Sequence, residues 1–401
     1  MKFWPALVLL VTLPAAAAPL SWPTNGWTRA TPEEVGLASE PLLAIDADFA
    51  AGKVPLVDDF LVVRCGSVAF ERKYSHDYAE IYYKEAHERG PLNAHLTGRY
   101  NYFDPAWHPY VHGTDEHTMQ SVSKSVTSAT IGLAIARGDF KASLDTPVLN
   151  FFDAKSVRNV DERKRRMTLR HVLTMTTGLD WDEDIPYDDP HNGSSLMEAK
   201  RDWVRFVIDQ PMAHEPGSTF AYSSGATELL AHIFKRATGQ DIERYARRYL
   251  FTPLGIRHYY WKRTPLGVVD TEGGLYLSAG DLAKIGYLYL HDGVWDGQRL
   301  LSSEWISDSM AAHVNLAANW NYGYQWWLAP YGNGPRYAWA ARGIGGQLLL
   351  VFPEDQLVAV VTAWHILDGT PYTPAVIDKL RLAVRDFDCT RRGSALEQRG
   401  N

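Results

Sequence analysis

Short apolar runs separated by turn residues occur near both ends of the chain. Residues 59–74 hold two apolar, β-branched runs on either side of Cys65-Gly66-Ser67, which predicts a strand, a turn and a second strand. Residues 347–352 and 356–363 are rich in Leu and Val, and Pro353-Glu354-Asp355 between them supplies turn residues. The pattern therefore predicts one hairpin from each end of the chain.

Between these hairpins the spacing of apolar residues becomes helical. The predicted helices cover residues 121–137, 168–177, 226–238 and 278–291, and a last amphipathic helix opens at Thr373-Pro374. Ser278 and Asp281 resemble a capping box at the start of the fourth helix. Glycines stand at or near the ends of three of these helices, as helix C-termini prefer: Gly178, Gly239 and Gly293.

The order of these elements predicts an α+β fold. An antiparallel sheet built from both chain ends is expected to be flanked by the terminal helices, with an all-helical domain inserted between them. The sheet domain is expected to comprise residues 18–118 and 322–390, and the mostly helical domain residues 119–321. A cleft is expected between the domains, and the loop at 182–195, rich in Asp, Pro, Gly and Ser, is expected to form its lid or rim.

The composition allows a full core but gives no sign of a polyanionic partner. The 401 residues, 46% of them apolar, suffice for two subdomains. The formal net charge of -7 is unlike the clustered basic face of nucleic-acid-binding proteins, so no nucleic-acid partner is expected. The basic run at 163–166 lies beside Asp161 and Glu162 and is expected to be a solvated edge.

The N-terminus is typical of an exported protein. Lys2, an apolar stretch at 3–13 and small residues at 15–18 predict a signal peptide over residues 1–17. The stretch is shorter than the ~20 residues of a spanning helix, so no stable membrane anchor is expected. The mature protein is expected in the periplasm or the medium, where Cys65 and Cys389 are free to pair. The sequence leaves open whether they form a disulfide or remain buried thiols.

Ser121-Val122-Ser123-Lys124 is the single Ser-x-x-Lys in the chain, and it begins an apolar helix. Residues three apart share a helical face, so the lysine amine can reach the serine hydroxyl. A neutral buried lysine can take the proton of that hydroxyl, and the helix N-terminus supplies backbone donors for an oxyanion. The alternative is a capping serine beside a surface lysine, and the motif alone does not decide between them.

Two further segments extend this hypothesis. Tyr222-Ser223-Ser224 lies on a predicted turn before a helix, where a phenol near Lys124 can shuttle protons and Ser224 can donate a hydrogen bond. The segment Ala341-Arg342-Gly343-Ile344-Gly345-Gly346-Gln347 leads into an apolar strand, and its glycines let a ligand approach the backbone. The alternatives are a packed tyrosine and a bulge or tight bend at the glycines.

In this order and spacing, the three segments resemble the serine β-lactamase and penicillin-binding-protein superfamily. The resemblance is strongest to its class C-like branch, which holds β-lactamases, carboxylesterases, D-amino-acid peptidases and 6-aminohexanoate oligomer hydrolases. It implies the β-lactamase/transpeptidase-like fold and an acyl-enzyme mechanism with no metal or cofactor. It covers most of the mature chain, because further segments match at 168–179, 254–256, 273–275, 281–283 and 322–327.

The resemblance also assigns roles to residues. Ser121 is expected to attack a carbonyl carbon, while Lys124 and Tyr222 share the proton transfers. Which of the two is the base stays open, because a coupled pair titrates as a unit. The N–H groups of Ser121 and Ile344 are expected to bind the oxyanion. The remaining expected substrate contacts are Ser224, Gly343 and Arg342.

The third segment departs from the drug-hydrolysing members, which carry Lys-Thr-Gly or a histidine variant where this chain has Ala341-Arg342-Gly343. The expected function is therefore hydrolysis of carboxylic esters or amides, on a small-molecule or peptide-like acyl substrate. One alternative is a β-lactamase or a D-peptidase acting on peptidoglycan peptides, and another is a sensor that is acylated without turnover. The sequence does not indicate the oligomeric state.

Three histidines precede the nucleophile and invite a metal-cluster hypothesis: His108, His112 and His117. A catalytic zinc site needs a fixed ligand geometry and outer partners that orient the ligands. The spacing of these histidines along a loop supplies neither, so no metal is expected.

Overall fold

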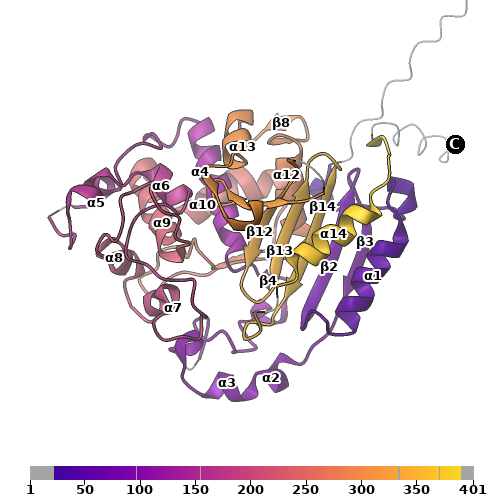
Figure 1. The fold of residues 1–401 in the computed structure, drawn as a ribbon, viewed down its shortest axis with the longest axis horizontal. Coiled ribbons are helices and arrows are strands. Elements are labelled where there is room, and N and C mark those ends of the chain that lie inside the picture. The colour runs from indigo at the N-terminus through magenta and orange to yellow at the C-terminus, as the bar shows by residue number, and fades with distance from the viewer. Residues whose placement is uncertain (1–21, 96, 154, 333–334, 370, 390–401) are drawn as a thin grey trace, which may run out of the picture.

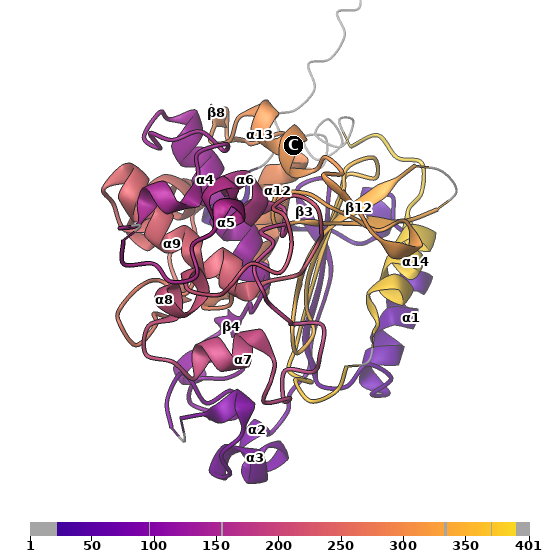
Figure 2. The same cartoon turned by 60° about the vertical axis from the view of Figure 1, so that its left-hand side comes forward.

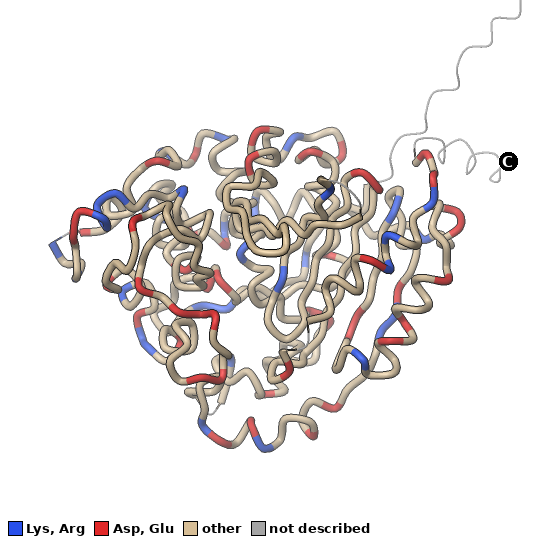
Figure 3. The backbone as a smooth tube through the Cα atoms, viewed as in Figure 1, with Lys and Arg blue, Asp and Glu red and all other residues tan. Residues whose placement is uncertain are grey.

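The computed structural model describes residues 22–95, 97–153, 155–332, 335–369 and 371–389. The predicted signal peptide at 1–17 lies outside these residues. Figures 1 and 2 show a large sheet with two helices on one face and a mainly helical region on the other. Acidic and basic residues are interspersed along the chain in the view of Figure 3.

The large sheet has nine strands in the order β1-β3-β2-β14-β13-β12-β11-β10-β9. The two predicted hairpins are β2 with β3 and β13 with β14, and β2 pairs with β14 at the centre of the sheet. All pairs are antiparallel except β1 with β3 at one edge. The strands are β1 Thr28–Arg29, β2 Val57–Arg64, β3 Ser67–Lys73, β9 Val314–Asn315, β10 Asn321–Tyr322, β11 Trp327–Pro330, β12 Tyr337–Gly343, β13 Gln347–Phe352 and β14 Leu357–Ala363.

Helices from both chain ends cover one face of this sheet. α1 (Ser39–Ala50) packs beside α14 (Thr373–Ala383), and their apolar side chains form one core with alternate residues of the central strands. On the opposite face α12 (Ala279–Leu290) packs against β13 and β14. Gly286 of α12 permits this close approach, because an added Cβ would lie 2.9 Å from Leu349 and Val358 side-chain atoms.

The inserted region is built around α4 (Val122–Ala136) and α9 (Ser224–Thr238), which pack against each other. Almost every residue of α4 is buried, and its polar side chains find partners inside the protein, as Ser125 and Ser128 do on the carbonyl oxygens of Gln325 and Tyr324. Two small sheets also lie here, β4-β6-β5 and β7-β8, with strands β4 His117–Thr118, β5 Tyr260–Trp261, β6 Leu275–Leu277, β7 Val294–Trp295 and β8 Gln298–Arg299. The shorter helices are α2 Tyr78–Ile81, α3 Tyr83–His87, α5 Glu162–Arg166, α6 Leu169–Leu173, α7 Gly193–Glu198, α8 Trp203–Ile208, α10 Ile242–Ala246, α11 Thr252–Leu254 and α13 Ser303–Ser309.

The α+β prediction is confirmed, while the domain boundaries at 118 and 321 stay a prediction. Two local expectations are wrong. The helix predicted over 168–177 ends at Leu173, because Gln325 Nε2 donates to its last carbonyls and Met175 turns to a φ of 57°. Lys164, in the basic run, is not solvated: its buried ammonium donates to the carbonyl oxygens of Arg158, Ile208 and Gln210.

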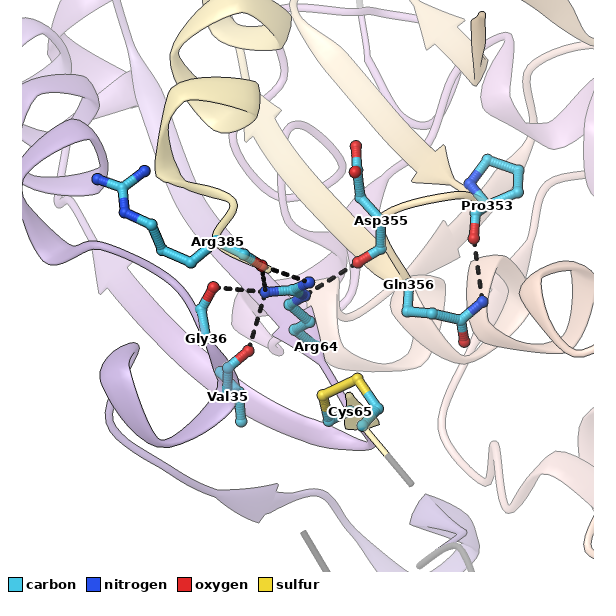
Figure 4. The surroundings of a disulfide bond; sticks show 9 residues. Val35, Gly36, Arg64, Cys65, Pro353, Asp355, Gln356 and Arg385 are labelled. Atoms are coloured by element: carbon cyan, nitrogen blue, oxygen red, sulfur yellow. Dashed lines mark hydrogen bonds between the residues drawn. A yellow bond between two sulfur atoms is a disulfide. The ribbon is translucent and has the colours of Figure 1, made fainter. Parts of the chain in front are cut away.

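The two cysteines form a disulfide. Cys65 in the turn between β2 and β3 is bonded to Cys389 beyond α14, across 324 residues of sequence. Beside it, Arg64 donates hydrogen bonds to carbonyl oxygens of Val35, Gly36, Arg385 and Asp355 (Figure 4). The C-terminal segment is therefore held to the sheet by a covalent bond and by one buried guanidinium.

Candidate active site

Ser121, the predicted nucleophile, lies at the N-terminal end of α4 and contacts Lys124. Lys124 Nζ lies 2.8 Å from Ser121 Oγ, one helical turn away. The Ser121 side chain makes no capping hydrogen bond, and the Lys124 side chain is only 1% exposed. The alternative of a capping serine beside a surface lysine is therefore excluded.

Lys124 is surrounded by oxygen atoms. Its ammonium donates to Ser224 Oγ at 3.0 Å and to the carbonyl oxygen of Glu272 at 2.8 Å, and the Glu272 carboxylate lies at 3.2 Å. Burial alone would lower the pKa of Lys124, but Tyr222, Glu272 and Glu183 together raise it above its ordinary value. These groups therefore favour the ammonium form of Lys124.

Tyr222 precedes α9 and faces the same pair. Its ring stacks on Trp327 at 5.6 Å, and Lys124 Nζ lies 5.3 Å from its centroid. Burial raises the pKa of Tyr222, while the nearby Lys124 charge and a hydrogen bond from Ser121 act in the opposite direction. The serine hydroxyl therefore lies between an ammonium donor and a phenol acceptor.

Ser224 joins this cluster to a carboxyl group that the sequence did not single out. Its hydroxyl donates to Glu183 Oε1 at 2.6 Å, and its N–H donates to Glu183 Oε2 at 2.7 Å. Trp181 Nε1 and the Tyr187 hydroxyl donate to the same carboxyl group. Glu183 belongs to the loop predicted as a rim at 182–195, so this loop is anchored to the cluster of Ser121, Lys124 and Ser224.

The turn between β12 and β13 brings Ile344 to the opposite wall. Gly343 makes this possible, because an added Cβ would lie 2.6 Å from the carbonyl oxygen of Met119. Gly345 and Gly346 adopt φ values of 80° and 102°, which favour glycine. Within the described part of the chain, neither the Ser121 nor the Ile344 N–H donates to a protein acceptor. Both residues line the same cavity, so both amides are available to a ligand.

This cavity has a volume of about 340 Å³ and combines the cluster with aromatic and cationic groups. Tyr187, Tyr222 and Trp327 contribute aromatic walls. The Arg342 guanidinium lies 5.4 Å from the Trp320 ring and 5.7 Å from the Trp327 ring. No carboxylate of the described residues lies within 4.0 Å of it, which leaves its hydrogen-bond donors to a ligand.

The three histidines do not converge on one point. His108 contacts the Tyr276 hydroxyl, and His117 contacts Asp58 at 3.0 Å. His112 lies against the Trp107 ring. Among the described residues, no cluster of His, Cys, Asp or Glu is arranged to hold a metal ion. Nor does any helix in these ranges combine the length and apolarity needed to span a bilayer.

The structure thus brings together every residue predicted for the site: Ser121, Lys124, Tyr222, Ser224, Arg342, Gly343 and Ile344. It adds Glu183 and Glu272, which sequence reasoning missed. Glu272 stands directly before the matched segment at 273–275, yet 148 residues separate it from Lys124, and such a separation carries no local signal.

An antiparallel sheet, an inserted helical region and a Ser-Lys-Tyr cluster between them define a serine hydrolase of the penicillin-recognising type. The chain belongs to the Beta-lactamase family, whose model matches residues 111–365. Solved structures share the fold. A putative 6-aminohexanoate-dimer hydrolase from Bacillus anthracis has a TM-score of 0.63 at 18% identity and covers 93% of this chain and 88% of its own. EstCE1, a hydrolase with promiscuous acyltransferase activity, has a TM-score of 0.62 at 16% identity, with 88% and 99% covered.

Two of the similar proteins are a 6-aminohexanoate-dimer hydrolase and an esterase. The 6-aminohexanoate-dimer hydrolase of Paenarthrobacter ureafaciens is 27% identical over 272 residues, which are 62% of this chain and 67% of that enzyme. Esterase EstB of Burkholderia gladioli is 29% identical over 146 residues, or 35% of this chain and only 36% of the esterase. The family is thus a hydrolase family with esterase and amide-hydrolase members.

Proposed function

We propose that the protein hydrolyses carboxylic esters or amides through an acyl-enzyme on Ser121. One observation carries the proposal: Ser121 Oγ lies 2.8 Å from the Lys124 ammonium, contacts Tyr222 and opens into a cavity with two unpaired backbone N–H groups. This arrangement activates a hydroxyl and can stabilise an oxyanion at the same place.

In the proposed mechanism Tyr222 is the base. Lys124 already donates to Ser121 and is held as an ammonium, so it is the weaker candidate for accepting the serine proton. Ser121 Oγ attacks the carbonyl carbon while its proton moves to the Tyr222 phenolate, and the N–H groups of Ser121 and Ile344 bind the oxyanion. Tyr222 then protonates the leaving alcohol or amine as the carbonyl re-forms.

Hydrolysis of the acyl-enzyme repeats these transfers with water. A water molecule gives one proton to the Tyr222 phenolate and attacks the ester carbon. The tetrahedral intermediate collapses to a carboxylic acid, and the proton on Tyr222 returns to Ser121 Oγ. Lys124 remains charged throughout and lowers the cost of the phenolate that forms twice in each turnover.

Arg342 favours an acidic substrate over a neutral one. Its guanidinium lies on the Tyr222 side of the cavity, over Trp327, which also stacks on Tyr222. Because Tyr222 protonates the leaving group, a carboxylate on that part of the substrate would reach Arg342. A β-lactam or a peptidoglycan peptide also carries such a carboxylate, so these substrates remain the second candidates despite the missing Lys-Thr-Gly.

The decisive experiment compares the wild type with Ser121→Ala on a para-nitrophenyl ester, with the intact mass recorded during turnover. Turnover and a transient acyl adduct in the wild type, both absent from the variant, would support the proposal. An adduct without turnover would support a sensor. Full activity in Ser121→Ala would refute the mechanism.

We also propose export through the predicted signal peptide, which detection of the mature protein outside the cytoplasm would test.

A further inference from the structure

A second, smaller cavity adjoins Ser121, and its walls are acidic. It has a volume of about 20 Å³, enough for one water molecule. Glu198, the last residue of α7, and Glu272, just before β6, both line it together with Ser121 and Ser224. Both glutamates are buried, with 8% and 4% of their surfaces exposed. The mechanism above gives neither carboxyl group a chemical step.

Both carboxyl groups line this small cavity, and Glu272 also contacts Lys124. Glu272 accepts a hydrogen bond from Lys124 through Oε2 and another from Glu198. Glu198 Oε1 in turn accepts from the Tyr102 hydroxyl at 2.5 Å. A hydrogen bond between two carboxyl groups requires one proton, so one member of the pair is neutral and the other is charged.

Other charged groups face this pair from several elements. Lys262, after β5, lies 3.9 Å from Glu198 and 3.1 Å from Asp270. Glu228 of α9 accepts from the Thr271 N–H beside Glu272, and Glu183 reaches Lys124 through Ser224. Tyr102, Tyr187 and Tyr276 complete the surroundings. The buried cluster thus holds more carboxyl groups than lysines, and burial penalises every unpaired negative charge.

The surroundings shift the pKa values of the two carboxyl groups in opposite directions. Burial raises the pKa of Glu198 to about 8 against the attraction of Lys262. Burial also acts on Glu272, but Lys124 and Lys262 outweigh it and lower the pKa of that carboxyl. At neutral pH the proton therefore resides on Glu198, which donates to the Glu272 carboxylate.

We propose that Glu198 and Glu272 form a positioning pair that shares one proton, and that its single negative charge holds Lys124 against Ser121 and sets the pH range of activity. The inference rests on the proposed function, because it concerns the same Ser121, Lys124 and Tyr222. Neither glutamate touches the reacting atoms. Each acts through Lys124, whose charge determines how readily Tyr222 becomes a phenolate.

The sign of the pH effect follows from electrostatics. A negative charge near an ionisable group raises its pKa, whether that group is an ammonium or a phenol. Loss of the Glu272 charge therefore lowers the pKa of both Lys124 and Tyr222. In kcat/KM against pH, the ascending limb reports formation of the Tyr222 phenolate and the descending limb reports loss of the Lys124 proton. Both limbs must move to lower pH.

The test measures kcat/KM against pH for para-nitrophenyl acetate in the wild type, Glu272→Gln, Glu198→Gln and the double variant. In Glu272→Gln both limbs should move down by about one pH unit or more. Glu198→Gln is the matched control, because glutamine mimics the neutral acid and should leave the profile below pH 8 unchanged. The double variant should shift at least as far as Glu272→Gln, since Glu198 can no longer ionise in its place.

Several results would overturn the inference without touching the proposed function. A uniform loss of activity in Glu272→Gln, with both limbs in place, would mean that Glu272 is structural only. Equal shifts of the ascending limb below pH 8 in the two single variants would mean that the charge is not localised on Glu272. An inactive wild type would instead refute the proposed function.

Infrared spectroscopy keeps the inference testable if Glu272→Gln does not fold. The difference spectrum of wild type minus Glu198→Gln at pH 7 should contain the carbonyl band of a neutral carboxylic acid, and this band should disappear as the pH rises through about 8. A carboxylate signal at pH 7 in that difference spectrum would overturn the inference.

Discussion

At the scale of single residues, Lys124 has more hydrogen-bond acceptors than an ammonium group has protons. Ser121 Oγ, Ser224 Oγ and both the carbonyl and the carboxylate of Glu272 surround its three donors. Such a cage favours the charged form and fixes the amine on the Ser121 side. This environment supports the proposed mechanism, in which the lysine is an electrostatic partner of Tyr222 and the phenol carries the proton transfers.

Substitution of Tyr222 by Phe tests this division of roles. Phenylalanine keeps the stacking on Trp327 but removes the hydroxyl, so kcat for an ester should fall by about 10²–10⁴. Pre-steady-state measurement of acylation and deacylation should show both steps slowed, because the phenol serves in each. If Tyr222→Phe retains wild-type kcat, Lys124 is the base.

Arg342 offers a second test at this scale. meta-Acetoxybenzoate carries a carboxylate on its leaving group, and meta-acetoxybenzamide is a neutral match. A charge-assisted hydrogen bond contributes about 1.5–3 kcal/mol, so the wild type should prefer the acid by roughly 10- to 100-fold in kcat/KM. Arg342→Gln should lose this preference but should still hydrolyse the acetyl ester of meta-acetoxybenzamide at the wild-type rate. Arg342→Lys should keep part of the preference. An equal loss of kcat/KM on both substrates would mean that Arg342 contributes packing and does not bind the carboxylate.

At the scale of elements, the turn from β12 to β13 positions Ile344, the proposed oxyanion donor. Gly343→Ala would place a Cβ 2.6 Å from the Met119 carbonyl oxygen, so the strand end must move away from Ser121. kcat should fall by at least about tenfold, since loss of an oxyanion donor costs 10²–10³. Gly280→Ala in α12 is the matched control, because its Cβ would meet Trp27 at an ordinary 3.7 Å. Equal kcat in both variants would mean that the position of this turn does not affect catalysis.

The sequence contained enough local pattern to predict most of these elements. The turn signals around Cys65-Gly66-Ser67 and Pro353-Glu354-Asp355 correspond to the two central hairpins, and Gly239 ends α9 in a left-handed conformation. The helix at 169–173 was predicted too long because its end depends on Gln325, about 150 residues away. Glu183 and Glu272 could not be predicted as site residues for the same reason, because their partners become neighbours only in the folded chain.

At the scale of the whole molecule, the disulfide ties the two chain ends together where the sheet already joins them. Cys65 belongs to the β2–β3 turn and Cys389 to the segment after α14, and β2 pairs with β14 at the sheet centre. The sequence allowed this pairing in an oxidising compartment but could not establish it, because the distance between the cysteines depends on how the C-terminal segment docks. Arg64 contributes to that docking through the Arg385 carbonyl (Figure 4).

Replacement of both cysteines by serine should therefore weaken the fold but not the chemistry. A cross-link over 324 residues restricts the unfolded chain strongly, and loss of such a bond typically costs about 2–4 kcal/mol. The denaturation midpoint in urea should fall, whereas kcat at moderate temperature should stay at the wild-type value, because neither cysteine lines the cavity at Ser121. Reduced wild type should match the variant. An unchanged midpoint would mean that the sheet and Arg64 hold the C-terminal segment without the disulfide, whereas a loss of kcat would mean that the two chain ends also position the site.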